Sequence, residues 1–215
     1  MTSNHTKGDR MFKDRFDAGQ QLANRLKEYA NDSNALIMAT PRGSYQIGTA
    51  IADVLQVPLD IFFNKKIGYP GNPDYTIGMV TLDDIVVDKR AIEFSGDMEA
   101  YLKKEISEIR HSLRNRAQEY YKEHAQYPLE GKSVIIVDEG MSTGRTIETI
   151  IDLIKKKNPA KMIVAVPVAS KEALHQVKKK VDEVICLQVP DNFMTINQWY
   201  LNTQPIDEQE LLLRI

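Results

Sequence analysis

The sequence has little that would attach the protein to a membrane or place it in an oxidising compartment. It contains one cysteine, Cys186, so an intramolecular disulfide is excluded, as is typical of proteins in a reducing cytosol. No apolar run approaches the roughly 20 residues that a membrane-spanning helix needs. The start of the chain, MTSNHTKGDR, is polar and does not resemble a secretory signal. We therefore expect a soluble, cytoplasmic protein.

Neither sign of charge dominates, and internal repeats and low-complexity tracts are absent. The net charge of −2 gives no general electrostatic attraction to nucleic acids or membrane surfaces. The chain has 215 residues, of which 42% are hydrophobic, and this suits one domain with a full core. We expect residues 1–10 to be disordered and residues 11–215 to form that domain.

Apolar patterns along the chain alternate between short β-branched runs and helix-periodic segments. Such alternation predicts an α/β fold with a doubly wound, mostly parallel sheet that helices cover on both faces. Between residues 65 and 75 two prolines, two glycines and an asparagine predict a long loop, and residues 77–87 read as a strand or a pair of strands. The other expected strands are 35–39, 59–63, 133–137, 162–166 and 183–189, and the expected helices are 11–29, 45–55, 98–123, a segment from 147 onward, 171–179 and 208–213.

The most informative stretch is SVIIVDEGMSTGRT, from Ser133 to Thr146. It reads as a buried strand, two carboxylates (Asp138 and Glu139), a glycine-containing turn and the beginning of a helix. A helix N-terminus has unpaired amides and a positive dipole, so it attracts anions, and the carboxylates suit sugar hydroxyls or a divalent metal. A phosphorylated sugar is therefore the first ligand class to test. The stretch is neither a Walker A loop nor a GxGxxG turn. The alternative is purely structural, because many α/β proteins end a strand with Asp and cap a helix with Ser or Thr.

Two further loops leave the carboxyl ends of predicted strands, where doubly wound sheets bind ligands. One contains Pro41, Arg42, Gly43 and Ser44, in which a guanidinium can fork onto phosphate oxygens and a glycine lets amides approach an anion. The other contains the cations at positions 65 and 66. We expect these loops to meet the central stretch at one site. An ordinary turn and a solvated strand end are the alternatives.

The central stretch resembles the signature of the type I phosphoribosyltransferases, in which a strand is followed by an acidic pair, a short loop and Thr-Gly-x-Thr. The resemblance implies that the acidic pair holds the ribose of phosphoribosyl pyrophosphate, that the loop amides hold its 5′-phosphate, and that residues 65–75 form a mobile catalytic lid. It also implies a small hood made by terminal segments. The implied substrate-binding residues are Gly43, Ser44, Asp138, Glu139, Gly140, Met141, Ser142, Thr143, Gly144, Arg145 and Thr146, and the implied catalytic residues are Arg42, Lys65, Lys66 and Asp74.

A narrower group within that family is closer still. Its pattern Asp-Arg-x-x-Ala-Gly-x-x-Leu-Ala matches residues 14–23 in full, and its Pro-Arg-Gly-Gly matches from Pro41 with Ser44 in place of the second glycine. Its Arg-Lys-x-Gly-x-Pro-x-x-x-Glu is similar to residues 65–74, with Asp74 in place of glutamate. Ser142 stands where the purine salvage enzymes of the family carry an aspartate that works on the purine ring. This departure disfavours hypoxanthine-guanine salvage, and Asp74 is an alternative acid or base.

The resemblance implies transfer of ribosyl 5-phosphate from phosphoribosyl pyrophosphate to a small acceptor, a nucleobase or an amine, with release of pyrophosphate. Mg²⁺ is the implied cofactor, carried by the substrate, with Asp138 as a candidate protein ligand. The implied partners are small molecules and a second copy of the chain, without nucleic acid or membrane. A regulatory protein that senses nucleotides without catalysis is the alternative, and hydrolysis or pyrophosphorolysis of a related phosphosugar is a third reading.

Overall fold

The computed structural model describes residues 11–41, 43–88, 90 and 98–204. Its contacts group the chain into two compact units, which we call the core unit (residues 1–61 and 127–214) and the insert unit (residues 62–126). The expected disorder of residues 1–10 and the expected helix 208–213 lie outside the described residues. The single domain over residues 11–215 stays a prediction, because one domain can contain two compact units.

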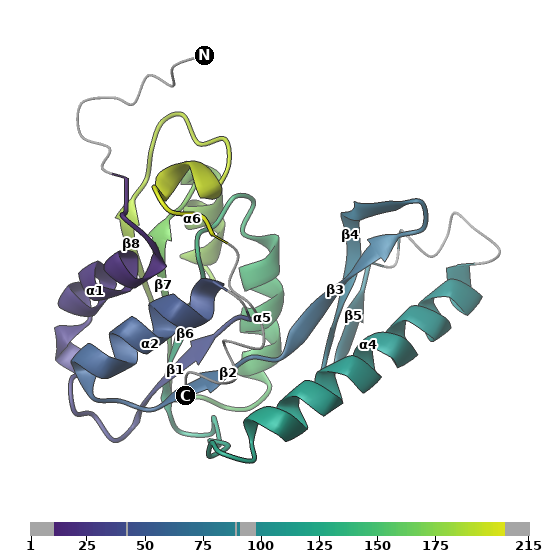
Figure 1. The fold of residues 1–215 in the computed structure, drawn as a ribbon, viewed down its shortest axis with the longest axis horizontal. Coiled ribbons are helices and arrows are strands. Elements are labelled where there is room, and N and C mark those ends of the chain that lie inside the picture. The colour runs from purple at the N-terminus through teal and green to yellow at the C-terminus, as the bar shows by residue number, and fades with distance from the viewer. Residues whose placement is uncertain (1–10, 42, 89, 91–97, 205–215) are drawn as a thin grey trace. The chain divides into compact units, whose positions relative to one another are not determined.

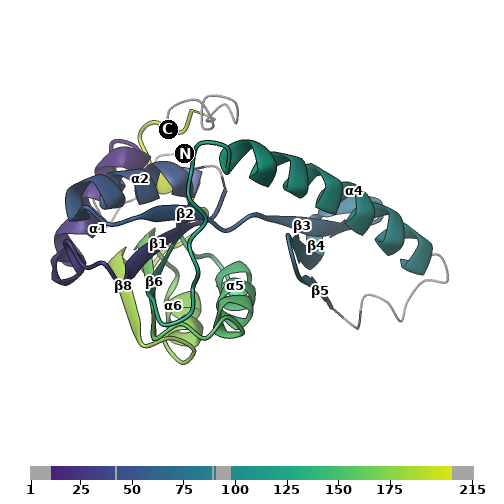
Figure 2. The same cartoon turned by 90° about the horizontal axis from the view of Figure 1, so that it is seen from below.

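The core unit is built on a five-stranded sheet in the order β2-β1-β6-β7-β8. All four strand pairs are parallel, which confirms the doubly wound sheet expected from the sequence. Helices α1 and α2 lie on one face of this sheet, and α5 and α6 lie on the other (Figures 1 and 2). The strands are β1 (Ala35–Ala39), β2 (Leu59–Ile61), β6 (Ser133–Val137), β7 (Lys161–Val168) and β8 (Glu183–Gln188), and the helices are α1 (Arg15–Arg25), α2 (Gly43–Leu55), α5 (Arg145–Lys155) and α6 (Lys171–Val177).

The apolar pattern explains why these elements form and where they pack. Strand β6 is the central strand of the sheet and β1 lies next to it, and their apolar residues are buried because helices cover both faces. Helix α5 buries one stripe of residues at helical spacing, namely Ile147, Ile150, Ile151, Leu153 and Ile154. Helices α1 and α2 approach closely at Gly19, where any Cβ would collide with the backbone of Ile47. Burial on both faces therefore fixes β6, whose carboxyl end carries the acidic pair.

The insert unit contains a three-stranded antiparallel sheet, β3-β4-β5, and a long helix, α4 (Met98–Tyr120). Its strands are β3 (Asn64–Tyr69), β4 (Asn72–Thr81) and β5 (Ile85–Val87), so the expected strand pair in residues 77–87 is present. Helix α4 packs against β3 and β4. Its Tyr101 hydroxyl donates a hydrogen bond of 2.8 Å to the carbonyl of Gly68 on β3.

The expected long loop over residues 65–75 is wrong, because this segment forms a β-hairpin. Pro70 and Gly71 occupy its two-residue turn, and Gly71 has a φ of 76°, as the second central residue of a type II turn requires. The pairing register shifts on both sides of Gly68, which lies against the backbone of Pro73. The prolines and glycines thus stand at the turn and at an irregular step, where a hairpin tolerates them.

Segments near the two ends of the described chain pack together on the core unit. The Phe12 amide donates to the carbonyl of Trp199 at 2.8 Å, and the Leu201 amide donates to the carbonyl of Phe12 at 2.9 Å. A short 3₁₀ helix, η2 (Asn197–Trp199), brings Trp199 and Tyr200 into a buried cluster with Phe12 and Val168. A second 3₁₀ turn, η1 (Lys27–Tyr29), follows α1. Over the described residues, none of the helices has both the length and the apolar character needed to cross a membrane.

Candidate functional site

Asp138 stands at the carboxyl end of β6, next to the end of its neighbour β1. Its Oδ1 accepts hydrogen bonds from the Ser44 hydroxyl at 2.7 Å and from the Glu139 amide at 2.9 Å. The Thr40 hydroxyl lies 3.0 Å from the same oxygen and 2.6 Å from the Ser44 hydroxyl, and both hydroxyl residues are buried. The structure therefore brings the loop of residues 41–44 and the central stretch together around one carboxylate.

Burial raises the pKa of Asp138, and the charge of Glu139 acts in the same direction. Hydrogen bonds from Ser44, from the Glu139 amide and from Thr40 oppose this shift because they stabilise the ionised form. These hydrogen bonds hold Oδ1, which leaves Oδ2 as the oxygen that can serve a ligand. A half-buried carboxylate with one oxygen already held suits a sugar hydroxyl, because the hydroxyl can donate a hydrogen bond to Oδ2.

Glu139 is held by an ion pair that sequence reasoning missed. The Arg15 Nε atom of α1 pairs with Glu139 Oε1, and their side chains are only 12% and 26% exposed. Gly43 lies directly beside this pair, and a Cβ at that position would collide with both side chains. Gly43 is thus needed because the Arg15–Glu139 pair occupies the space in front of the first turn of α2.

Tyr200 completes this arrangement from the C-terminal segment. Its hydroxyl donates to the Glu139 carbonyl at 2.7 Å, and the Arg15 guanidinium carbon lies 5.5 Å from the centre of its ring. Burial and the nearby Glu139 raise the pKa of Tyr200, so it is a neutral hydrogen-bond donor. Arg15 lies within the matched motif of residues 14–23, which was the signal for its role, whereas nothing local marked Tyr200.

The loop from Gly140 to Gly144 is attached to the connection between β7 and α6. The Met141 amide donates to the Val168 carbonyl, and the Ser170 amide donates to the Met141 carbonyl, both at 2.9 Å. The Ser170 hydroxyl also donates to the Ser142 carbonyl at 2.6 Å. The loop is therefore fixed at its beginning and at its middle, as an anion site needs.

Helix α5 begins after Gly144, which has a φ of 78° and lies in the left-handed region. No hydrogen bond from a described side chain caps this end, so the first amides of α5 remain available to an anion. Within the loop, Ser142 and Thr143 are exposed, as is Arg145 at the start of the helix. Backbone amides and hydroxyls therefore surround the start of α5, as expected for a phosphate site.

The remaining predicted residues lie elsewhere or outside the described chain. Arg42 is not among the described residues, although its neighbours Gly43 and Ser44 lie beside the acidic pair. Lys65 and Lys66 are exposed on β3, and Asp74 is exposed on β4, so all three belong to the insert unit. Their part in catalysis stays a prediction.

The described residues contain no cluster of three or more His, Cys, Asp or Glu side chains that could hold a metal ion. Cys186 forms no part of the site. Burial raises the pKa of its thiol to about 11, and the thiol lies 3.1 Å from the carbonyl of Gln188. This thiol stays protonated at neutral pH.

Comparison with known proteins identifies the family. The family described as "Phosphoribosyl transferase domain" matches residues 11–204. A protein of Mycobacterium tuberculosis (strain H37Rv), Rv0571c, whose name assigns it provisionally to the phosphoribosyl transferases, is 30% identical over 207 residues. That alignment covers 93% of this chain and 45% of the relative, so the chain spans about half the length of the curated relatives it matches.

Solved structures share the fold of this chain. TT1426 from Thermus thermophilus is 30% identical and has a TM-score of 0.76, with 94% of this chain and 96% of that chain covered. The AQ2163 protein from Aquifex aeolicus, at 14% identity and a TM-score of 0.51, covers 81% of this chain and 74% of its own, and it supports the fold alone. The parallel sheet, the acidic pair at the end of β6 and the family match over residues 11–204 all lead to the same conclusion: this chain belongs to the phosphoribosyl transferase domain family.

Proposed function

We propose that this protein binds phosphoribosyl pyrophosphate and transfers its ribosyl 5-phosphate to a nucleobase or amine acceptor, releasing pyrophosphate. The observation that carries this proposal is the pairing of an oriented carboxylate, Asp138, with the uncapped N-terminus of α5 at the end of the same strand and loop. Asp138 accepts hydrogen bonds from a sugar, and the amides at the start of α5 donate hydrogen bonds to a phosphate. Membership of the family supports the same substrate class.

In this proposal the core unit positions the sugar phosphate. The amides between Met141 and Thr146 and the hydroxyls of Ser142, Thr143 and Thr146 hold the 5′-phosphate. Asp138 accepts hydrogen bonds from the ribose hydroxyls. Glu139 contributes through the oxygen that Arg15 does not engage, and Arg15 reduces the repulsion between the two adjacent carboxylates.

The reaction itself occurs at C1 of the ribose. The bond from C1 to the pyrophosphate oxygen breaks, its electron pair leaves with pyrophosphate, and the acceptor forms a new bond to C1 through an oxocarbenium-like transition state. Arg42, the amides of Gly43 and Ser44, and Lys65 or Lys66 stabilise the negative charge of the leaving group. The hairpin of β3 and β4 excludes water, which would otherwise hydrolyse the activated sugar.

Magnesium fits this site as a companion of the substrate. Mg²⁺ commonly uses one or two carboxylates together with substrate phosphates, and Asp138 and Glu139 are two adjacent carboxylates at this site. Asp138 is the carboxylate that would hold it, and the bound ion would supply neutralisation of the phosphate charge.

A pyrophosphate-release assay tests the proposal. Phosphoribosyl pyrophosphate and Mg²⁺ are incubated with the protein and a panel of nucleobases and small amines, with Asp138→Asn as the matched variant. We expect acceptor-dependent release that the variant lowers by about tenfold or more, because hydrogen bonds to a charged group contribute roughly 1.5–3 kcal/mol. Binding of phosphoribosyl pyrophosphate without release for any acceptor would instead support the regulatory reading. Failure to bind it would reject the proposed substrate.

A further inference from the structure

Helix α4 of the insert unit carries an open surface pocket, called the cavity on α4 below, that the proposed transfer reaction does not use. Among the described residues it is lined by side chains of α4 alone, and its volume is about 530 Å³. The lining residues are Lys103, Ile106, Ser107, Arg110, His111 and Arg114. Three of the six are permanent cations and none is acidic, so the lining is strongly positive.

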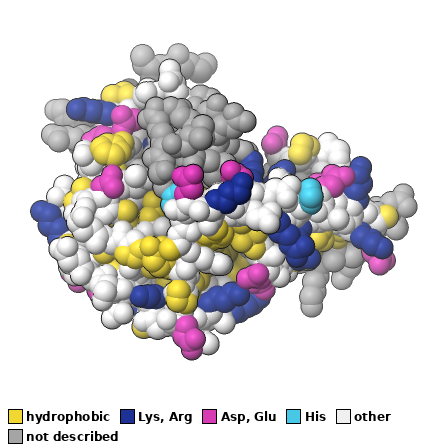
Figure 3. All heavy atoms as spheres, turned by 60° about the horizontal axis from the view of Figure 1, so that its bottom comes forward, with side chains coloured by type: hydrophobic (Ala, Val, Ile, Leu, Met, Phe, Trp, Pro, Cys, Tyr) yellow, Lys and Arg dark blue, Asp and Glu magenta, His cyan; other side chains and the backbone are white. Residues whose placement is uncertain are grey.

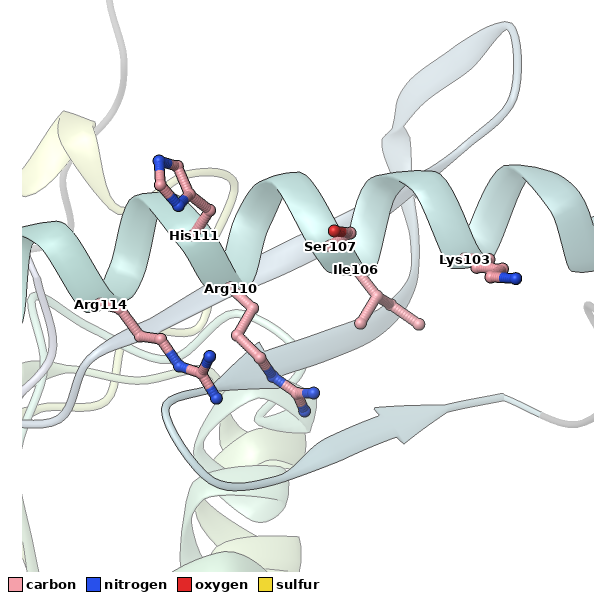
Figure 4. Close-up of a pocket in the computed structure, with 6 residues that line it drawn as sticks. All are labelled: Lys103, Ile106, Ser107, Arg110, His111 and Arg114. Atoms are coloured by element: carbon pink, nitrogen blue, oxygen red, sulfur yellow. The ribbon is translucent and has the colours of Figure 1, made fainter.

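The cations of this cavity differ from their neighbours on the same helix. Lys104 pairs with Glu108, and Lys122 pairs with Glu119 just beyond the helix. Lys103, Arg110 and Arg114, in contrast, have no acidic partner among the described residues. Figure 4 shows the side chains of Arg110 and Arg114, one turn apart, extending in the same direction from the helix. Two adjacent guanidinium groups repel each other unless an anion lies between them.

The guanidinium of Arg110 provides an independent observation that points to an anion. Its Nε atom is buried and has no hydrogen-bond partner within the described part of the chain. Buried donors are nearly always paired, so an orphaned one on a cation calls for a specific explanation. An anion seated against Arg110 and Arg114 would satisfy this donor.

We propose that this cavity is a second anion site, which binds a small molecule carrying phosphate groups. Guanidinium groups fork onto phosphate oxygens, and the Ser107 hydroxyl offers one more donor. Ile106 provides an apolar contact for the organic part of such a ligand. The proposal rests on α4 alone and does not depend on the transfer reaction.

A small molecule is favoured over a polynucleotide because the positive charge is local. Nucleic-acid surfaces need a basic stripe that follows many phosphates. On the face that Figure 3 shows, acidic and basic side chains are interspersed and form no such stripe. The Lys104–Glu108 pair also interrupts the positive charge along α4.

Titration calorimetry with inorganic pyrophosphate tests the site. The test variant is Arg110→Met with Arg114→Met, which removes the charges and keeps side chains of similar length. The matched control is Lys104→Met, which removes a cation of the same helix outside the cavity. We expect the double variant to weaken one pyrophosphate site by about tenfold or more, and the control to stay within about twofold of the wild type. The core-unit site is intact in all three proteins, so its presence or absence does not affect the comparison.

Equal affinity and stoichiometry in the double variant and the control would overturn the proposal. Circular dichroism melting shows whether the double variant is folded; if it is not, Arg114→Met alone replaces it, since that side chain is exposed. The single variant should bind pyrophosphate about threefold or more weakly, and unchanged binding would again overturn the proposal. A single-stranded oligonucleotide serves as the competing probe. If it binds more tightly than pyrophosphate and loses that binding in the variant, the small-molecule assignment is wrong.

Discussion

Asp138 is a carboxyl group whose ionisation is opposed by burial in the folded protein. Because its folded pKa is raised above the ordinary value of 3.8, its contribution to stability is fully present below pH 3.8 and is lost as the pH rises through the raised pKa. Asp138→Asn keeps the Oδ1 acceptor and removes the charge. We therefore expect the variant to melt at a higher temperature than the wild type at neutral pH. Its melting temperature should also lack the fall that the wild type shows as the pH rises through the raised pKa of Asp138.

The same variant should bind ribose 5-phosphate more weakly, because the amide group offers a donor where the sugar needs an acceptor. Calorimetry with ribose 5-phosphate and with inorganic phosphate separates a lost contact to the sugar from a changed conformation of the phosphate loop. A loss confined to ribose 5-phosphate, of about tenfold, supports contact with the sugar hydroxyls. Equal losses for both ligands would show that Asp138 acts through the conformation of the loop.

Gly43 gives a second prediction at the scale of one residue. In Gly43→Ala the new Cβ would collide with Arg15 and Glu139, so the ion pair must separate or α2 must move. We expect a loss of about 1–3 kcal/mol in the free energy of unfolding, the usual cost of overpacking. Urea denaturation measures it. The control is the same substitution in a background that carries Arg15→Ala and Glu139→Ala, where both colliding side chains are gone, and an equal loss in that background would contradict the role assigned to Gly43.

Local sequence predicted the position of the acidic pair but not its partners. The run of β-branched residues before Asp138 indicates a buried strand, and a strand end places its last side chains at the site. Arg15 and Tyr200 are remote from Glu139 in sequence, and only the packed fold brings them to it. An ion pair of this kind leaves no spacing signal in a single sequence.

At the scale of elements, the beginning of α5 is the feature to perturb. Gly144→Val introduces a branched side chain where φ is 78°, beside the amides proposed to bind phosphate. We expect the affinity for ribose 5-phosphate to fall by at least ~2 kcal/mol while the fold remains, since charge-assisted hydrogen bonds are lost. Calorimetry measures the affinity. Gly131→Val has a similar φ of 71° and provides the matched backbone strain away from the loop. Unchanged affinity in Gly144→Val would exclude this loop as the phosphate site.

The hairpin of β3 and β4 offers a test of catalysis against binding. Residues 71–76 at its tip are exposed, so a short Gly-Ser linker in place of residues 69–75 removes no buried side chain. Binding of ribose 5-phosphate should stay within roughly 1 kcal/mol, and transfer should fall by about two orders of magnitude as positioning and water exclusion are lost. Both are measured on the same preparation. A linker variant that turns over like an active wild type would disprove the lid assignment.

This hairpin also shows where composition misleads. Prolines and glycines in residues 65–75 favour a loop in any prediction that uses local composition alone. Here Pro70 and Gly71 make the turn, while pairing between β3 and β4 absorbs Gly68 and Pro73 at an irregular step. The strands themselves were visible in part, because residues 77–87 read as a strand or a pair of strands. Turn and irregular step can be distinguished from a loop only once the partner strand is known.

For the whole molecule, the connection between the two units leads to a deletion experiment. The Tyr127 amide donates to the buried Asp60 carboxylate at 3.3 Å, so the chain leaves and re-enters the core unit at neighbouring points. Replacing residues 62–126 by a short glycine-rich linker should therefore leave a folded core unit that binds ribose 5-phosphate. Circular dichroism and calorimetry test this. A product that is unfolded, or that is folded but does not bind, would show that the core unit depends on the insert.

The parallel sheet was predictable at this scale because five apolar runs alternate with amphipathic segments. The division into two units was not, since a boundary at Ile61 and Tyr127 has no proline-rich or glycine-rich linker to mark it. The sites follow the same division. The residues proposed to hold the phosphate and the ribose belong to the core unit and were visible in sequence, whereas the cavity on α4 depends on which cations lack partners.

The separation of β1 from β6 has a consequence for the order in which the chain folds during synthesis. Thr40 and Asp138, which meet at the ends of these strands, are 98 positions apart, so the ribosome completes the insert before the centre of the core sheet exists. The insert pairs consecutive strands, β3 with β4 and β4 with β5, and can fold as soon as it emerges. Once folded, it shortens the flexible loop that β1 and β6 must close, which lowers the entropic cost of their pairing. The insert would then act as a folding aid for the sheet that it interrupts.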